Sequence, residues 1–154
     1  MKLTFIGADH QVTGSCHFLE VGNMKVLIDC GMEQGNIQYK NAELPVSYKD
    51  IDYVFLTHAH IDHAGMLPWI YARGFRGRVI TTYATVDLCE IMLKDSAHIQ
   101  EMEAEWKNRK ARRAGREEVE PLYTTRDAEN VMEHFEGVAY GQIFKLNDNL
   151  TLRF

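Results

Sequence analysis

Three histidines and an aspartate lie within six consecutive residues, His58-Ala59-His60-Ile61-Asp62-His63. Neutral imidazole and carboxylate are ligands that suit zinc. In an extended loop alternate side chains project to the same side, so we expect His58 and His60 to bind one metal ion together. Asp62 continues that alternation, and His63 begins the next helical turn and points differently. We therefore expect Asp62 and His63 to hold a second metal ion nearby.

A pair of metal ions gives this cluster a definite chemistry. Two metals about 3.5–4 Å apart share a hydroxide and stabilise the attacking and leaving oxygens of a phosphodiester. Coordination lowers the pKa of water towards ~7, so a nucleophile exists at neutral pH. The alternatives are a group of surface histidines or a closed structural zinc site. A closed site normally uses cysteine, and none lies near the motif. We favour the hydrolytic centre.

The segments around the motif are expected to hold it rigidly. Residues 53–57 form a short, continuous, β-prone apolar run, which predicts a buried strand that ends at the histidines. A helix is expected from about Ala64 to Arg73, with Pro68 tolerated in its first turn and Gly74 at its C-terminal cap. Ligands at the exit of a buried strand are positioned by the scaffold.

The N-terminal part and the middle of the chain alternate strands with loops and helices. Strands are expected at residues 2–8, 16–21, 24–29 and 78–81, with a two-residue turn at 22–23 and a loop over 31–50. A long helix is expected from about Tyr83 to Lys110, capped by Thr82. Its apolar positions are Val86, Cys89, Met92 or Leu93, Met102 and Trp106.

The C-terminal part predicts one more helix and a hairpin. Thr124-x-x-Asp127 resembles a capping box, which opens a helix that Gly137 closes. Residues 142–146 and 150–154 are expected to pair through a turn at 147–149. The complete order of elements predicts a layered α/β protein.

Size and charge bound the class of protein. The 154 residues make one domain or part of one. The formal net charge of -5 excludes a basic footprint over the whole chain, although a metal centre and a local basic patch can still bind phosphate. Three widely spaced cysteines, no secretory signal and no apolar run of membrane length predict a cytoplasmic protein.

Two weaker signals lie in the long helix. Six basic residues occur within residues 107–116, and they favour either contacts with RNA phosphates or a solvated helix end balanced by nearby acids. We favour the solvated end, because the acids nearly cancel the local field. For His98 a packing or surface role is favoured over a place beside the active site.

The histidine motif, preceded by an apolar strand and Leu56-Thr57, resembles the central motif of the metallo-β-lactamase superfamily. Further segments resemble its β-CASP branch of RNA-processing nucleases, which includes the pre-mRNA 3′-end cleavage endonuclease and RNase J. These segments are residues 5–8, 12–16, 27–32, 95–100 and 120–124. The resemblance covers essentially the whole chain.

The resemblance implies a four-layer αββα fold, two zinc ions and hydrolysis of RNA phosphodiesters. Carried over by position, His58 and His60 bind the first zinc, and Asp62 and His63 bind the second. Asp29 matches the first motif of the family, so Asp29 and Asp62 are the candidate catalytic acids, with Asp29 steadying the histidine loop. The alternative for Asp29 is a strand-end acid satisfied by backbone amides.

The chain also departs from the family pattern. The family has a third histidine for the first zinc in an Asp-Ala-Gly-His segment after a strand like 150–154, and later a bridging aspartate and further histidines. Catalytic zinc sites usually have three or more protein ligands. We therefore expect residues 1–154 to be the N-terminal part of a metallo-β-lactamase-like domain, with the remainder and the β-CASP domain absent. Alone it should bind zinc weakly and be nearly inactive.

Two other functions stay open at this point. The motif alone also fits a hydrolase of a small thioester or lactam, although the β-CASP-like segments argue against it. A non-catalytic interaction fragment is the third possibility. An exposed strand edge at 150–154 is expected to pair copies of the chain into a homo-oligomer.

Overall fold

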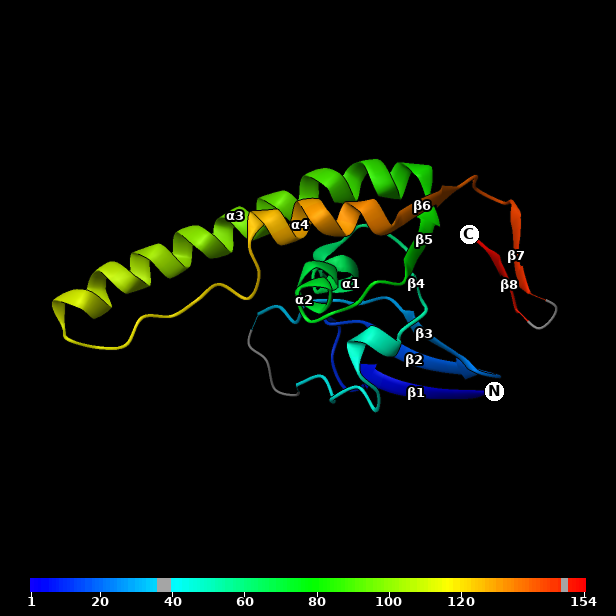
Figure 1. Cartoon of the computed structure of the whole chain (residues 1–154), viewed down its shortest axis with the longest axis horizontal. Coiled ribbons are helices and arrows are strands. Elements are labelled where there is room, and N and C mark those ends of the chain that lie inside the picture. The colour runs from blue at the N-terminus through cyan, green and yellow to red at the C-terminus, as the bar shows by residue number, and fades with distance from the viewer. Residues whose placement is uncertain (36–39, 148–149) are drawn as a thin grey trace.

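A six-stranded sheet lies between a layer of helices and a two-stranded hairpin (Figure 1). This is a computed structural model, in which residues 1–35, 40–147 and 150–154 are described. The sheet has the order β1-β2-β3-β4-β5-β6, antiparallel from β1 to β3 and parallel from β3 to β6. The strands of the sheet are β1 (Lys2–Gly7), β2 (Cys16–Val21), β3 (Met24–Ile28), β4 (Tyr53–Phe55), β5 (Arg78–Thr82) and β6 (Phe135–Val138).

The helices lie on one face of the sheet, and the hairpin lies on the other. The helices are α1 (Ile61–Ala64), α2 (Leu67–Ala72), α3 (Tyr83–Arg113) and α4 (Thr125–Val131), with short 3-10 turns η1 (Tyr48–Asp50) and η2 (Met132–His134). The hairpin strands are β7 (Ile143–Asn147) and β8 (Leu150–Arg153). The C-terminal half of α3 projects well beyond the sheet (Figure 1).

Both faces of the central strands are buried, which is why their sequences are continuously apolar. Val54 and Leu27 pack into the core on the helical side, whereas Phe55 and Val26 pack into a second cluster under the hairpin. Phe144 of β7 is among the residues that cover this second cluster. The predicted α/β fold of metallo-β-lactamase type is confirmed, and the hairpin forms a separate two-stranded sheet.

The prediction of one helix from Ala64 to Arg73 is wrong, because the chain forms two short helices there. α1 begins earlier, at Ile61, and ends at Ala64. Pro68 then lies in the first turn of α2, where its missing N–H costs nothing. As a consequence Asp62 lies in α1 and does not continue the extended alternation that the sequence suggested.

The long helix begins after Thr82 as predicted. The side chain of Thr82 caps the helix by accepting a hydrogen bond from the backbone N–H of Thr85. α3 ends at Arg113, beyond the predicted Lys110. The predicted buried positions Cys89 and Leu93 are confirmed, but Met102 and Trp106 are 58% and 57% exposed. The projecting half of the helix has no sheet beneath it to cover these side chains.

The predicted closure of the last helix by Gly137 is also wrong. The capping box of Thr124 and Asp127 is present, but α4 ends at Val131 and is followed by η2. Gly137 instead lies within β6, where an added Cβ would stand 2.4 Å from the ring of Tyr83. A short strand with a central glycine gives little β signal, so this edge strand was missed.

The hairpin is present with bounds shifted by one residue, and positions 148 and 149 of its expected turn lie outside the described residues. Within the described part of the chain, no helix is long and apolar enough to cross a membrane. Pairing between copies through residues 150–154 stays a prediction.

Candidate metal centre

The carboxyl ends of the parallel strands bring the candidate residues to one edge of the sheet. Asp29 directly follows β3, and the histidine motif follows the neighbouring strand β4. The backbone N–H of Asp29 donates to the carbonyl of Phe55 across these strands at 3.0 Å. Residues at the ends of adjacent parallel strands therefore converge here, as ligand sites of open α/β sheets do.

Backbone hydrogen bonds fix the histidine loop against two distant segments. The carbonyl of Asp62 accepts from the N–H of Ser15 at 2.8 Å, and the carbonyl of His63 accepts from the N–H of Cys30 at 2.7 Å. Gly31 passes so close that an added Cβ would lie 1.7 Å from the carbonyl oxygen of Asp62. Only glycine, which has no Cβ, allows the two backbones to come this close. Contacts between main-chain atoms therefore help to hold the histidine loop in place.

Asp29 is the organising group of the site. Its side chain is almost fully buried and its backbone has a φ of 60°, a conformation that aspartate tolerates better than most residues. Oδ1 accepts from the N–H and the hydroxyl of Thr57, both at 2.9 Å. Oδ2 accepts from the hydroxyl of Ser15 at 3.1 Å and from Nδ1 of His63 at 2.7 Å. Side-chain donors thus supply most of its bonds, which goes beyond the strand-end acid satisfied only by backbone amides.

These bonds assign the tautomers of two histidines. A carboxylate is only an acceptor, so Nδ1 of His63 carries the proton and Nε2 keeps its lone pair. The hydroxyl of Thr57 donates its hydrogen bond to Asp29. The hydroxyl oxygen of Thr57 therefore accepts a hydrogen bond from Nδ1 of His58, which lies 3.0 Å away. Both imidazoles are therefore prepared to bind a metal ion through Nε2.

The four predicted ligands lie together. The ring centroid of His58 is 4.7 Å from that of His60 and 4.0 Å from that of His63. A carboxylate oxygen of Asp62 lies 3.6 Å from Nε2 of His63. The members of each predicted pair are adjacent, and the ring of His58 also lies next to that of His63.

Electrostatics favour the neutral, metal-binding form of His58. Burial lowers its pKa below the usual value, and the neighbouring His63 and His60 lower it further. Because zinc competes with protons for the imidazole lone pair, a lowered pKa makes the lone pair more available.

The donor chemistry fits zinc, but the number of donors is small. Among residues 1–35, 40–147 and 150–154, no three histidine, cysteine or carboxylate side chains are arranged to hold one metal ion. The cluster offers four candidate ligands, and the tautomers of His58 and His63 suit metal binding. Two candidate ligands for each ion are fewer than the three that catalytic zinc usually has.

The sequence missed Thr57 and Ser15 as functional residues. Thr57 lies between the buried strand and His58, and this position beside a predicted metal ligand could have marked it as a functional residue. Ser15 lay in the segment 12–16 that resembles the family, but its contact with Asp29 could not be predicted. That contact arises because antiparallel pairing of β2 with β3 places the residue before β2 beside the residue after β3.

The structure also shows the surroundings of the basic residues in 107–116, of His98 and of Cys30. Three of the six basic residues form ion pairs with acids: Lys107 with Glu103, Arg109 with Glu105, and Arg112 with Glu118. This supports the solvated helix end. His98 is exposed on α3, and it is not a member of the histidine cluster. Cys30 is buried, and burial raises its pKa well above the usual value, so it is not a nucleophile.

Comparison with known proteins decides the family. A sequence model described as the metallo-beta-lactamase superfamily domain matches residues 18–153. The chain belongs to the metallo-β-lactamase superfamily. Its sequence relatives place it in the β-CASP RNA-processing branch, so the predicted resemblance is confirmed.

Among these relatives, the chain is 37% identical to Ribonuclease TTHA0252 of Thermus thermophilus, over 100% of this chain and 32% of that protein. It is 32% identical to Cleavage and polyadenylation specificity factor 73 of Drosophila melanogaster, over 91% of this chain and 19% of that protein. The chain therefore spans about a third or less of the length of these relatives.

Solved structures agree on the fold of this metallo-β-lactamase superfamily member. The metallo-beta-lactamase SMB-1, in a complex with mercaptoacetic acid, superposes with a TM-score of 0.53 at 18% identity, covering 96% of this chain and 47% of that one.

Proposed function

We propose that this chain carries the metal-binding part of a zinc-dependent hydrolase that cleaves RNA phosphodiester bonds with a metal-activated water. The supporting observation is the set of hydrogen bonds that Asp29 accepts, from Nδ1 of His63 and from the hydroxyl of Thr57, whose oxygen in turn accepts from Nδ1 of His58. These bonds place the proton of each ring on Nδ1, so Nε2 of His58 and Nε2 of His63 both keep a lone pair for a metal ion. Relatives that are named as ribonucleases point to RNA as the substrate.

The roles proposed for the residues follow from their positions. His58 and His60 would hold one zinc ion, and Asp62 and His63 would hold the other. When bound, zinc supplies a Lewis acid that lowers the pKa of water towards ~7 and stabilises charge on phosphate oxygens. Asp29 keeps the Nδ1 proton of His63 in place and orients the ring. With two ligands per ion, residues 1–154 alone should bind zinc weakly and turn over RNA slowly or not at all.

Metal titration of the chain tests the site. Zinc affinity is measured by competition with a chromophoric chelator for the wild type, His58→Ala and His63→Ala. We expect each substitution to weaken binding by roughly tenfold or more, since a ligand is lost from an already sparse set. The matched control is His98→Ala on the exposed side of α3, which should bind as the wild type does. Equal affinities in all four proteins would refute the proposed ligands.

A chimaera separates RNA hydrolysis from other hydrolytic functions. Residues 1–154 replace the matching segment of the Thermus thermophilus ribonuclease, and the product is assayed with single-stranded RNA, a β-lactam and a small thioester. We expect cleavage of RNA that is lost with His58→Ala, and no turnover of the lactam or the thioester. A folded, zinc-loaded chimaera that hydrolyses a small substrate but leaves RNA intact would favour the alternative function.

The remaining proposals concern the surroundings of the protein. RNA is the proposed partner. The cysteines at 16, 30 and 89 are free, as a reducing compartment permits, and the cytoplasmic location stays a prediction.

A further inference from the structure

The two oxygens of the Asp29 carboxylate serve different pairs of the proposed metal ligands. Oδ1 accepts two hydrogen bonds from Thr57, whose hydroxyl oxygen in turn accepts from Nδ1 of His58. Oδ2 accepts from Nδ1 of His63 at 2.7 Å and from the hydroxyl of Ser15 at 3.1 Å. A carboxylate has about four lone-pair sites, so these donors occupy all of them. Oδ1 therefore acts on the first ligand pair, and Oδ2 acts on the second.

A group that orients a histidine must itself be held by something other than that histidine. At Oδ1 of Asp29, the backbone N–H and the hydroxyl of Thr57 provide this hold. At Oδ2 the donors are His63 itself and the hydroxyl of Ser15. Ser15 therefore fixes the end of the carboxylate against which His63 is aligned. Because Ser15 is only 7% exposed, bulk water does not compete freely for this bond.

The main chain holds Ser15 in place on both sides. Its N–H donates to the carbonyl of Asp62 at 2.8 Å, and its carbonyl accepts from the N–H of Gly31 at 2.8 Å. The preceding residue, Gly14, has a φ of 84°, and its carbonyl oxygen lies 2.1 Å from where a Cβ on Gly7 would stand. The hydroxyl is thus presented to Oδ2 from a close-packed backbone. These main-chain bonds do not use the hydroxyl, so they remain when it is removed.

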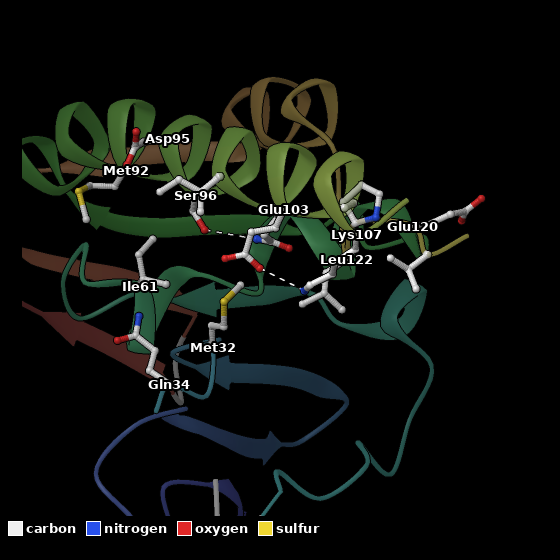
Figure 2. Close-up of a pocket in the computed structure, with 15 residues that line it drawn as sticks. Met32, Gln34, Ile61, Met92, Asp95, Ser96, Glu103, Lys107, Glu120 and Leu122 are labelled. Carbon is white, nitrogen blue, oxygen red and sulfur yellow. Dashed lines mark hydrogen bonds and ion pairs between the residues drawn. The ribbon is translucent and has the colours of Figure 1, made fainter. Parts of the chain in front are cut away.

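The backbone of the second ligand pair is also fixed without the hydroxyl. The carbonyl of His63 accepts from the N–H of Cys30 at 2.7 Å, and the carbonyl of Ile61 accepts from the N–H of Met32 at 2.9 Å. Ile61 and Met32 lie together in the lining of a groove beneath α3 (Figure 2). With the main chain held at these points, the orientation of the His63 ring remains to be set. Oδ2 of Asp29 sets it.

We propose that Ser15 is a positioning residue for the second pair of metal ligands. By donating to Oδ2 of Asp29, its hydroxyl holds the carboxylate in the position that aligns the ring of His63 for metal binding. The inference rests on the proposed function, because the metal ion at the second pair is part of that proposal. It adds that different hydroxyl groups position the two pairs, that of Thr57 the first and that of Ser15 the second.

Long-range proton–nitrogen NMR correlation spectra of the metal-free chain test this positioning, because ring-nitrogen shifts report the tautomer and hydrogen bonds of each histidine. Spectra recorded at about pH 8 contain mostly neutral imidazoles. We expect Ser15→Ala to shift the ring nitrogens of His63 and to leave those of His58 in place. Ser15→Thr, which keeps the hydroxyl, should retain the wild-type shifts of His63. Thr57→Val is the mirror variant and should shift His58 more than His63.

Zinc affinity, measured by competition with a chromophoric chelator, tests whether the effect passes through His63. Ser15→Ala should weaken binding roughly three- to tenfold, the effect of one hydrogen bond. The same loss should appear in a His58→Ala background, which keeps the second pair. It should vanish in a His63→Ala background, where no ring is left to align. Ser96→Ala is the matched control, because its hydroxyl is hydrogen-bonded to that of Tyr123, and it should bind zinc as the wild type does.

The outcomes separate a failure of this inference from a failure of the metal centre. Unchanged His63 shifts or unchanged zinc affinity in folded Ser15→Ala protein would overturn the role of Ser15 alone. Equal losses in the His58→Ala and His63→Ala backgrounds would also overturn it, because they would indicate a general loosening of the loop. Equal zinc affinity of the wild type and the His58→Ala, His63→Ala double variant would overturn the proposed function together with this inference. Thermal melts check folding, and Ser15→Cys, a weak donor of similar shape, replaces Ser15→Ala in the spectra if the alanine variant does not fold.

Discussion

Nδ1 of His63 lies 2.7 Å from Oδ2 of Asp29, a residue 34 positions earlier in the chain. This contact determines which nitrogen of His63 carries the proton. It also ties the first turn of α1 to the end of β3, so the geometry of the metal centre depends on the central sheet.

Asp29→Asn should weaken zinc binding by roughly 10- to 100-fold, the usual effect of losing a partner that orients a metal-binding histidine. The amide nitrogen can donate to Nδ1 of His63, which moves the ring proton to Nε2 and removes the lone pair needed by the metal. Chelator competition measures the affinity. Asp87→Asn, an exposed acid on α3, serves as the control. Wild-type affinity in a folded Asp29→Asn protein would show that Asp29 does not set the tautomer.

Gly31→Ala should destabilise the loop that carries the ligands. The added methyl group would meet the carbonyl oxygen of Asp62 at 1.7 Å and the amide nitrogen of Ser15 at 2.8 Å, both of them backbone atoms that cannot move independently. We expect a loss of about 3 kcal/mol or more in the free energy of unfolding, measured by urea denaturation. Gly22→Asn is the control, because nothing lies near that Cβ and asparagine tolerates its positive φ. Equal stability of the two variants would contradict the close approach at Gly31.

The two faces of α3 should respond differently to truncation. Leu93 is fully buried, so Leu93→Ala should lower the free energy of unfolding by about 2–5 kcal/mol through lost burial and a cavity. Ile91 is 66% exposed on the same helix, and Ile91→Ala should change it by less than about 0.5 kcal/mol. Urea titrations of both variants give the comparison. A larger effect at Ile91 would mean that the helix is rotated relative to the core.

The three cysteines should be unreactive in the folded chain and should make stability fall at alkaline pH. Burial raises the pKa of Cys16 and of Cys89 from the usual 9.0 to about 12, and the nearby carboxylate of Asp29 contributes at Cys16. Between these values the unfolded chain loses thiol protons that the folded chain keeps. The free energy of unfolding therefore decreases as pH rises above 9.

Alkylation with iodoacetamide, followed by mass spectrometry, measures this protection. Labelling at pH 8 should be slow in the native chain and fast in urea, with free cysteine as the rate standard. Native labelling at the rate of the unfolded chain would show that the thiols are accessible.

The sequence determined the chemistry and most of the local structure. The types and spacing of His58, His60, Asp62 and His63 were enough to predict a metal centre, and the apolar run before them predicted the strand that presents it. The signals were strong because they are local: a capping hydroxyl, a continuous apolar run and a cluster of ligand side chains are all contained in a few neighbouring residues. Where the local signal was weak, as in β6 around Gly137, the prediction was wrong.

Only the tertiary structure decided how those residues work together. The proton positions on His58 and His63 depend on Asp29 and Thr57, which the parallel pairing of β3 and β4 brings to one edge of the sheet. The buried face of α3 and the groove beneath it likewise depend on what packs against the helix. A hydrogen bond requires atoms to meet within about 3 Å, and for segments far apart in the sequence that meeting is set by the packing of the whole chain.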